Sequence, residues 1–289
     1  MSPGTAGPQK KMSAGKMGAG KMSVGVHPDA GTERATLILA PNANTMTLDG
    51  TNTWLLHEPG ARRAAVVDPG PLDEAHLAVV REAAEAAGVE IAVILLTHGH
   101  LDHSEAAPRL SELVGGVPVR ALDRQYRLGD DEGLRGGDVI ELDGLEIRVV
   151  ATPGHTGDSL CFTVPADRAI LTGDTILGRG TTVVAHPDGR LGDYLETLQN
   201  LRVLAEKNEI ATVMPGHGPV LPDAMSVVEY YLEHRAQRLD QVKAAFAAGD
   251  GTTDDVVRRV YADIDPAIRF AAELSVRAQL EYLGVGGRS

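Results

Sequence analysis

The stretch THGHLDH, residues 97–103, places three histidines and one aspartate within seven consecutive positions. The chain of 289 residues contains only ten histidines, so this crowding asks for a chemical reason. Neutral imidazole and carboxylate are preferred ligands of zinc and of its neighbours among the divalent metals. The stretch follows a short apolar run, residues 91–96, which is typical of a buried strand. It therefore predicts a metal site at the end of a strand, in an α/β or α+β fold.

The spacing within this stretch separates the candidate ligands into two pairs. A strand that reached Thr97 would present His98 and His100 on the same side, because side chains alternate with period two. Asp102 and His103 would point elsewhere, because the chain turns there into a helix. The two pairs predict two neighbouring metal ions.

Three later motifs supply further candidate ligands, each beside a turn. They are TPGHTGDS with His155, LTGDT with Asp174 and PGHGP with His217. Each stands where a short apolar run gives way to a loop, and such loops commonly carry functional groups. Because a zinc ion takes about four ligands, these side chains would complete the site that the first stretch begins.

In this order the motifs resemble those of the metallo-β-lactamase superfamily. The matching segments are VDPG (67–70), HGHLDH (98–103), GH (154–155), GD (173–174) and GHG (216–218). Their order and spacing fit from about residue 35 to about residue 220. The resemblance implies an αββα sandwich with a dinuclear zinc site along one edge, and it implies a hydrolase.

The resemblance also implies which side chain holds which ion. One zinc would be bound by His98, His100 and His155, the second by Asp102, His103 and His217, and Asp174 would bridge the two. Such a pair of ions would keep net positive charge and hold a bridging hydroxide as the nucleophile near neutral pH. Iron and manganese are the alternative metals. Asp102 would also take or give a proton during turnover.

Three further residues belong to the predicted site. A ligating histidine usually donates its second ring N–H to a carboxylate or carbonyl, and the resemblance places Asp68 in this role. The alternative is that Asp68 only begins a turn before Pro69. Asn52 and Arg179 are predicted in loops that face the site, as substrate contacts.

Short apolar runs alternate with helical patterns from Arg34 on. Strands are expected over residues 35–41, 51–56, 64–70, 91–97, 118–122, 138–142, 145–152, 159–164, 168–174 and 211–217. Helices are expected over residues 72–88, 104–113, 191–207, 225–249, 252–264 and 266–283. We expect a metallo-β-lactamase-like domain over residues 33–222.

Residues 223–289 are expected to form a small helical C-terminal domain. GRGTTVV (178–184), PGHGPVL (215–221) and YLEHRAQR (231–238) are together similar to the lactamase-β-2-like branch of the superfamily, which implies a winged-helix-like unit. The final segment GVGGRS leaves little room for the wing.

Residues 1–32 are expected to form a disordered tail. The segment repeats Lys and Met among Ser, Gly and Ala, and it cannot bury enough apolar surface to order itself. A transit peptide fits less well, because the segment lacks arginine before Arg34. Met12, Met17 or Met22 are alternative start sites.

The composition bears on where in the cell the protein is located. No stretch approaches 18 uninterrupted apolar residues, so no membrane span is expected. Cys161 is the only cysteine, which excludes an intramolecular disulfide and favours a cytoplasmic location; a homodimer is allowed. Cys161 and the remaining histidines are interpreted as packing or surface residues; these histidines are His27, His57, His76, His186 and His234.

The substrate stays open between a small thioester or ester and single-stranded RNA. The net charge of −13 repels a polyanion. Four arginines would form a local phosphate-binding face, or else lie on ordinary helix surfaces: Arg235, Arg238, Arg258 and Arg259. β-Lactam hydrolysis is a further alternative, which the bridging Asp174 disfavours because the zinc β-lactamases typically lack it. A non-catalytic metal-binding protein is the last alternative.

Overall fold

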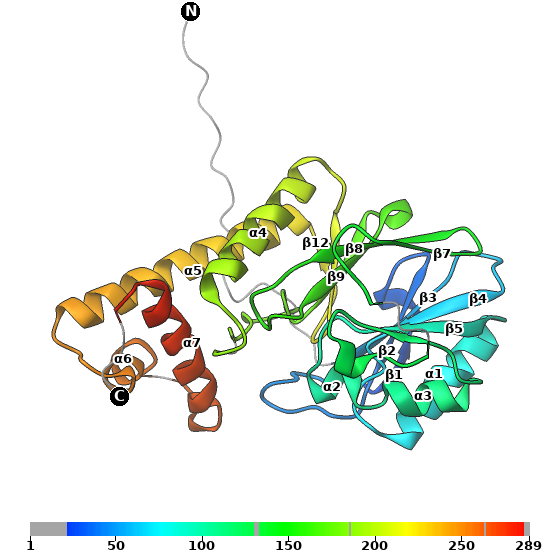
Figure 1. Cartoon of the computed structure of the whole chain (residues 1–289), viewed down its shortest axis with the longest axis horizontal. Helices are drawn as coiled ribbons and strands as arrows, with labels where there is room; N and C mark the ends of the chain where they lie inside the picture. Colours follow the sequence, from blue (N-terminus) through cyan, green and yellow to red (C-terminus); the bar gives the residue numbers. More distant parts are fainter. Residues whose placement is uncertain (1–21, 130–132, 185, 263, 286–289) are drawn as a thin grey trace, which may run out of the picture.

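Two six-stranded sheets face each other in the structure, a computed structural model that describes residues 22–129, 133–184, 186–262 and 264–285 (Figure 1). The first sheet, in the order β1-β2-β3-β4-β5-β6, consists of β1 (Gly25–His27), β2 (Ala35–Leu39), β3 (Asn52–Leu56), β4 (Arg63–Val67), β5 (Glu90–Leu95) and β6 (Val119–Arg120). The second, in the order β12-β11-β10-β9-β8-β7, consists of β7 (Val139–Leu142), β8 (Leu145–Ala151), β9 (Leu160–Val164), β10 (Ala169–Gly173), β11 (Thr212–Pro215) and β12 (Leu221–Pro222).

Helices cover the outer faces of both sheets. The α-helices are α1 (Glu74–Ala86), α2 (Leu101–Ser104), α3 (Ala107–Leu113), α4 (Leu191–Glu206), α5 (Ala224–Ala247), α6 (Thr253–Val260) and α7 (Arg269–Tyr282). Single 3-10 turns are η2 (Pro28–Ala30), η3 (Arg124–Tyr126), η4 (Pro165–Asp167) and η5 (Pro266–Ile268). Helices α1 and α3 pack on the first sheet, and α4 and α5 pack on the second. This confirms the expected αββα sandwich.

The strands are apolar on both faces because both faces are buried. In β2, Leu37 points into the core between the sheets, and its neighbour Ile38 points into the core beneath α1 and α3. In β9, Phe162 lies between the sheets and Cys161 faces α4 and α5. Alternation with period two thus divides one continuous apolar run between two cores.

Helix α5 belongs to two cores at once. Val227 and Tyr231 in its first half pack with α4 on the second sheet. Val242 and Ala245 in its second half pack with α6 and α7 in a separate small core. The C-terminal helical region is confirmed. In the part of the chain that the structure describes, no strand follows β12, so no wing is present there.

The expected disordered tail needs correction. The expected tail reached residue 32, but β1 pairs antiparallel with β2, and η2 follows it. Met22 packs against the core between the sheets, so the ordered region begins well before residue 33. Residues 1–21, with Met12 and Met17, lie outside the described residues. The pattern did not reveal β1, because three residues are too few to show alternation.

The expected helix over residues 104–113 is also interrupted. Helix α2 ends at Ser104 and α3 begins at Ala107, with Pro108 in its first turn. Proline has no N–H to donate to the preceding turn, so it begins a new helix rather than continuing one. Within the described residues, no helix is both long enough and apolar enough to cross a membrane.

Candidate metal centre

The candidate ligands meet because their loops leave strands that run in the same direction. Strands β4 and β5 are parallel, as are β10 and β11. Strands β8 and β10 are both antiparallel to β9, so they run the same way as each other. The loops after these strands therefore emerge at one edge of the sandwich; they carry Asp68, the 97–103 stretch, His155, Asp174 and His217.

The side chains form two groups in which the ligand atoms all lie within 4.8 Å of one another. The first consists of His98, His100, His155 and Asp174, and the second consists of Asp102, His103 and His217. The structure thus brings together all seven predicted ligands, in the predicted division. The reason given for the first pair was wrong, because β5 ends at Leu95 and period-two alternation does not extend to His100.

Distances within each group suit a divalent ion. In the first group, the Nε2 atoms of His98 and His155 lie 3.0 Å and 3.1 Å from Nδ1 of His100. In the second, the Nε2 atoms of His103 and His217 are 3.2 Å apart. Ligand nitrogens around a tetrahedral zinc lie about 3.3 Å from one another, given Zn–N bonds of about 2.0–2.1 Å. The donor set and its spacing therefore fit a metal ion in each group.

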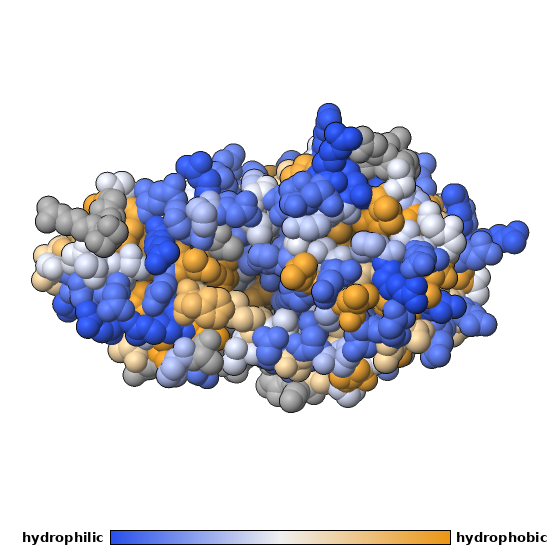
Figure 2. Space-filling model, turned by 60° about the horizontal axis from the view of Figure 1, so that its bottom comes forward, coloured by the Kyte–Doolittle hydropathy of each residue, from blue (hydrophilic) through white to orange (hydrophobic). Residues whose placement is uncertain are grey.

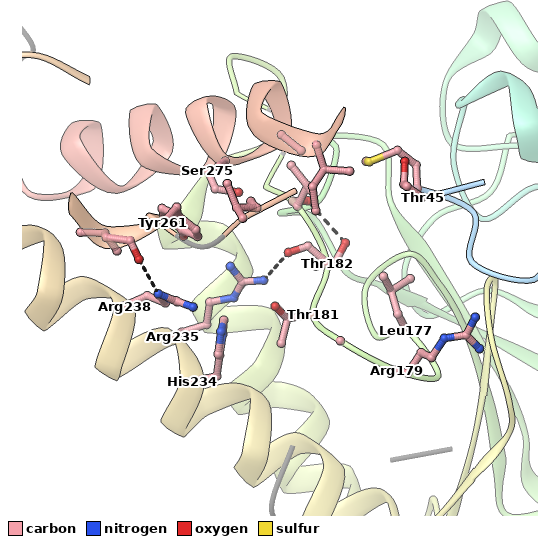
Figure 3. Close-up of a pocket in the computed structure, with 18 of the residues that line it drawn as sticks. Thr45, Leu177, Arg179, Thr181, Thr182, His234, Arg235, Arg238, Tyr261 and Ser275 are labelled. Carbon is pink, nitrogen blue, oxygen red and sulfur yellow. Dashed lines mark hydrogen bonds between the residues drawn. The ribbon is translucent and has the colours of Figure 1, made fainter. Parts of the chain in front are cut away.

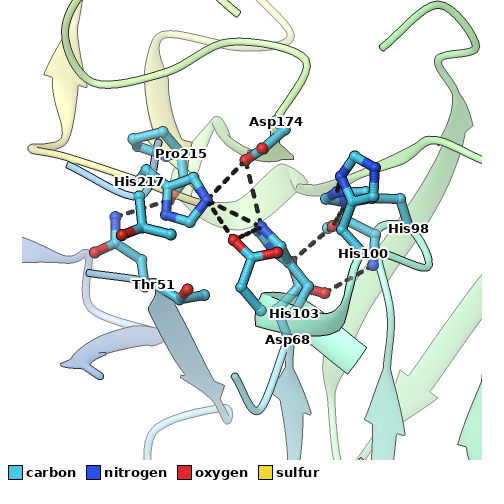
Figure 4. A network of polar contacts seen from close by, with 12 residues as sticks. Thr51, Asp68, His98, His100, His103, Asp174, Pro215 and His217 are labelled. Atoms are coloured by element: carbon cyan, nitrogen blue, oxygen red, sulfur yellow. Dashed lines mark hydrogen bonds and ion pairs between the residues drawn. The ribbon is translucent and has the colours of Figure 1, made fainter. Parts of the chain in front are cut away.

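Asp174 lies between the two groups (Figure 4). Its Oδ1 is 3.3 Å from Nε2 of His217 and 3.4 Å from Nε2 of His103, both in the second group. Its Oδ2 is 3.6 Å from Nε2 of His155, in the first group. Oδ1 is buried and has no hydrogen-bond partner among the described residues. Two oxygens that face different groups are what a bridging carboxylate requires.

Backbone carbonyls and Asp68 orient the histidine rings. His155 Nδ1 donates to the Val183 carbonyl at 2.6 Å, and His217 Nδ1 donates to the Gly50 carbonyl at 3.0 Å. His103 Nδ1 contacts Oδ2 of Asp68 at 2.8 Å. Because carbonyl and carboxylate oxygens only accept, the Nδ1 atoms carry protons and Nε2 is the atom that each ring presents to the centre.

Asp68 has the left-handed backbone conformation, with φ of 51°, so it both forms a turn and contacts His103. Its Oδ1 accepts from the backbone N–H of Thr97 at 2.8 Å, and its Oδ2 accepts from the Thr97 hydroxyl at 2.7 Å. Since that hydroxyl has donated its proton, it accepts from His98 Nδ1 at 3.0 Å. One carboxylate therefore supports a histidine in each group.

Burial and charge set the protonation of the ligands. Burial lowers the pKa of His155 to about 4 and the pKa of His98 well below its usual range. Burial also acts to lower the pKa of His103, but the nearby carboxylates of Asp174, Asp68 and Asp102 outweigh it and raise that pKa well above its usual range. Burial would raise the pKa of Asp102, but His103 and His217 lower it to about 2.

Two glycines of the motifs are required by close packing. A Cβ atom at Gly216 would lie 2.7 Å from Cε1 of His103 and 3.0 Å from Oδ1 of Asp174. A Cβ atom at Gly99 would lie 2.0 Å from the ring of Tyr126. Gly216 therefore lets the ligand loops approach one another, and Gly99 lets the first ligand loop pack against Tyr126.

A cavity of about 640 Å³ extends from the metal centre to the C-terminal helices (Figure 3). His155 and Asp174 line it at the centre, and the loop of residues 177–183 forms one side. The opposite wall comes from α5 with His234, Arg235 and Arg238, and from residues between α6 and α7. The expectation that His234 is a packing or surface residue needs correction, because it lines this cavity. In the sequence, only its position within YLEHRAQR could have indicated that it lies near the site.

Arg235 links α5 to the metal centre. Its side chain is buried, its guanidinium lies 4.9 Å from the centre of the Tyr194 ring, and Nη2 donates to the Thr182 carbonyl at 2.6 Å. The next residue, Val183, supplies the carbonyl that orients His155. The C-terminal region thus holds the loop that supports a candidate ligand. The sequence contained no signal for this role of a loop carbonyl.

A second cavity, of about 480 Å³, lies beside His100. Its lining includes three carboxylates, Asp123, Asp158 and Asp188, and the ring of Tyr126. The exposed His100 and the two cavities leave the centre open to solutes. An open site favours catalysis over a purely structural role.

The two predicted substrate contacts have different outcomes. Asn52 is completely buried and donates to the carbonyls of Pro215 and Gly218 at 2.9 Å and 2.8 Å, so its prediction was wrong. It lies on β3, beneath the His217 loop. Arg179 lines the first cavity but forms a paired hydrogen bond with Asp49, at 2.6 Å and 2.8 Å. Its contact with substrate stays a prediction.

The predicted phosphate-binding face does not form as one surface. Arg258 and Arg259 on α6 are exposed and pair with Asp255 and Asp250, respectively. Arg235 is buried, so it is not a surface residue at all. Only Arg238 combines partial exposure with the absence of an ion pair among the described residues.

Comparisons with known proteins place these features in context. Residues 46–217 match the family model described as "Metallo-beta-lactamase superfamily". A "Beta-lactamase-like protein 2 homolog" of Caenorhabditis elegans is 31% identical over 262 residues, which cover 87% of this chain and 84% of that protein. The "Atrochrysone carboxyl ACP thioesterase" of Aspergillus fumigatus is 31% identical over 220 residues, 75% of this chain and 66% of that protein. A solved beta-lactamase domain protein from Burkholderia ambifaria has a TM-score of 0.73 at 21% identity, with 90% of this chain and 89% of that chain covered.

Proposed function

The chain belongs to the metallo-beta-lactamase superfamily, and on that premise we propose that it is a dinuclear zinc hydrolase of small acyl thioesters. The relative from Caenorhabditis elegans confirms the predicted likeness to the lactamase-β-2-like branch. The observation that carries the proposal is Asp174, whose two oxygens face separate ligand groups at the end of a cavity. The fold and the ligand groups support a metal-dependent hydrolase.

The residues that would hold the ions are the seven of the two groups described above. When bound, the ions would polarise the thioester carbonyl and acidify a water molecule so that it attacks the carbonyl carbon. Asp174 holds the groups together, and its pKa is well below the usual range despite burial, because His217 and His103 lie beside it. Asp102 is partly exposed, so its carboxylate can exchange a proton with solvent.

The two cavities favour a small thioester over RNA. A strand of RNA crossing the centre would extend into both cavities, and the second one would bring its phosphates against Asp123, Asp158 and Asp188. Like charges repel in such a cleft, and a chain of net charge −13 adds to this effect. A small thioester can occupy the first cavity alone. The thioesterase from Aspergillus fumigatus supports the same choice of bond.

The donor set also bears on the metal. Imidazole suits zinc and iron, whereas manganese prefers oxygen ligands. Five histidines and two carboxylates therefore favour zinc over manganese. Metal analysis of the purified protein would settle its identity. The cytoplasmic location and the homodimer stay predictions.

The test is release of thiol from hexanoyl-N-acetylcysteamine by the zinc-loaded protein. Burial raises the pKa of the only thiol, Cys161, to about 11, so the folded protein adds little to a colorimetric thiol assay. We expect Asp174→Ala to abolish the release and to reduce bound zinc. His57→Ala, a histidine outside both groups, is the matched control and should behave as the unmodified protein.

End-labelled single-stranded RNA is incubated with the same preparations. Thiol release that is equal in the Asp174→Ala protein would overturn the proposal. So would cleavage of RNA that depends on Asp174 in a protein that leaves the thioester intact.

A further inference from the structure

The wall that the C-terminal helix α5 contributes to the first cavity is cationic (Figure 3). His234, Arg235 and Arg238 occupy one stretch of this helix, and all three line the cavity. The positive charge comes from the two arginines, because burial beside them lowers the pKa of His234 to about 4 and leaves its ring neutral. Among the described residues, no ion pair joins any of them to a carboxylate. This is unusual for a chain with 40 acidic and 27 basic residues.

The polar atoms of this wall are incompletely satisfied. Nε of Arg235 and Nδ1 of His234 are buried without a hydrogen-bond partner among the described residues. Within the described part of the chain, Arg238 donates only to neutral oxygens, those of Gln241 and the Val260 carbonyl, and it lies over the ring of Tyr261 at 4.7 Å. A buried cationic group without a counter-ion is costly, so an anion supplied from outside would stabilise the wall.

The other charged side chains around the cavity do not neutralise the positive charge of the α5 wall. Arg179 and Arg259 also line it, but Asp49 and Asp250 neutralise them. Asp174 is the one acidic side chain among the described lining residues, and it belongs to the metal centre. The cavity therefore has a metal end and a separate cationic end.

Apolar side chains also line the cavity. They come from the loop at Leu48, from Leu177 and Val183, and from Ile264, Ile268 and Ala271 near α7. Figure 2 shows hydrophobic residues gathered at the junction between the C-terminal helices and the sandwich. A ligand that matches this lining would have a reactive carbonyl at the metal end, an anionic group at the cationic wall and an apolar part that joins them.

We propose that His234, Arg235 and Arg238 select thioesters that carry an oxyanion, separated from the scissile carbonyl by an apolar stretch. This inference rests on the proposed function. A carboxylate on the acyl chain and a phosphate on the thiol arm both present such an oxyanion, and guanidinium groups bind both through charge-assisted hydrogen bonds. Arg235 also holds the 177–183 loop, so Arg238 is the residue to vary.

The experiment compares substrates that differ only in the anion. The acyl series runs from succinyl to suberyl on N-acetylcysteamine, each beside the neutral acyl group of equal length. A neutral acyl group on phosphopantetheine forms the second arm. The measured quantity is the ratio of kcat/KM for the anionic substrate to that for its neutral counterpart. We expect a ratio above about 10 for at least one chain length, because a hydrogen bond to a charged group is stronger than one between neutral groups.

Variants assign the preference to the wall. Arg238→Gln should lower this ratio about tenfold, mainly through KM, and Arg238→Lys should restore part of it because the charge is kept. Arg258→Gln, which removes the same charge from the exposed surface of α6, is the matched control and should leave the ratio unchanged. A ratio near one in the unmodified protein, or equal ratios in the Arg238 and Arg258 variants, would overturn the inference.

Failure of the inference can be told apart from failure of the proposed function. Cleavage of neutral and anionic thioesters at equal rates would leave the hydrolase intact and remove only the selectivity. Calorimetric titration with adipate and hexanoate adds a readout independent of turnover. Tighter binding of adipate that Arg238→Gln abolishes would support the anion site even if no thioester is cleaved, and binding of adipate that Arg238→Gln leaves unchanged would contradict it.

Discussion

At the scale of single residues, Asp68 supports more of the site than any other residue outside the ligand groups. It accepts from Thr97 and His103, and through the Thr97 hydroxyl it also fixes the ring of His98. Its left-handed backbone conformation is strained, and this turn lets the carboxylate contact both Thr97 and His103. Outer partners of this kind tune metal affinity as strongly as some ligands do.

Asp68→Asn should weaken zinc binding by roughly 10–100-fold, because an amide cannot stabilise the His103 ring as a carboxylate does. Competition with a chromophoric chelator would measure the change. Asp143→Asn is the matched control, since Asp143 also has a positive φ, of 48°, but pairs with Arg63 far from the centre. Equal zinc affinity in the two variants would argue against the role of Asp68.

Metal binding should release a proton near neutral pH. The raised pKa of His103 means that its ring is protonated in the metal-free protein, and a metal must displace that proton. Apparent zinc affinity should therefore rise about tenfold for each pH unit until the pH reaches that raised pKa. The lowered pKa values of His98 and His155 keep these rings neutral and add no further dependence.

The same proton stabilises the metal-free fold. This contribution to stability is complete below the unfolded pKa of histidine and is lost as the pH rises through the raised pKa of His103.

Calorimetric titrations of zinc in two buffers of different protonation enthalpy would count the protons that metal binding releases. Identical heats in both buffers would contradict the prediction.

At the scale of elements, α5 stabilises the loop that follows Asp174. The hydroxyl of Tyr231 accepts from the Leu177 N–H at 2.8 Å, and Arg235 one turn later donates to the Thr182 carbonyl. Tyr194 on α4 donates to the Thr175 carbonyl at 2.7 Å. Helices on the outer face of the second sheet therefore determine the course of the loop at the metal centre.

Tyr231→Phe should lower the free energy of unfolding by about 1–3 kcal/mol, because the buried Leu177 N–H loses its acceptor. Urea denaturation of the metal-free protein would measure the loss. Tyr230→Phe is the control, because Tyr230 makes no hydrogen bond among the described residues. A similar loss in both variants would show that the ring, and not the hydroxyl, matters.

Elements with a strong local pattern were predictable from the sequence. Strands β2 to β5 and helices α1 and α4 lie close to their expected positions, because both apolar alternation and helical spacing are long enough there to be distinguished. The interruption between α2 and α3 depends on one proline, and β1 depends on pairing with β2. Such features arise from a single residue or from tertiary contacts, which a periodic pattern does not encode.

At the scale of the whole molecule, the C-terminal helices are not an appendage. The expected boundary at residues 222 and 223 falls before α5, yet Val227, Val228 and Tyr231 complete the core over the second sheet. A separate helical unit begins only in the second half of α5. The division of the chain into two domains stays a prediction, with α5 shared between them.

A chain shortened to end at residue 222 should fail to fold. Burial of each large apolar side chain of α5 contributes about 1.5–3 kcal/mol, and several of them together approach the total stability of a typical protein. A chain that ends at residue 248 keeps α5 and should unfold cooperatively, as followed by circular dichroism during heating. Cooperative unfolding of the shorter chain would show that α5 is dispensable.

The candidate ligands were predictable because their motifs are local, whereas the cavity was not. His98, His155 and Asp174 stand in short, distinctive contexts. The cationic wall joins α5 to loops distant in the sequence, and Asn52 was misjudged because its burial depends on the His217 loop above it. The burial of a side chain and its neighbours arise from the tertiary fold. The metal ligands after the strands were therefore easier to predict than the residues that line the cavity.

The parallel course of the strands gathers the ligand loops at one edge. It also determines when the metal ions can bind during folding. His98, His100, Asp102 and His103 follow the first sheet, and His155, Asp174 and His217 follow the second. Neither half of the chain can bind an ion with a full set of ligands alone. Each captured ion is a non-covalent cross-link between two separately built layers, so it arrives late in folding and then resists their separation.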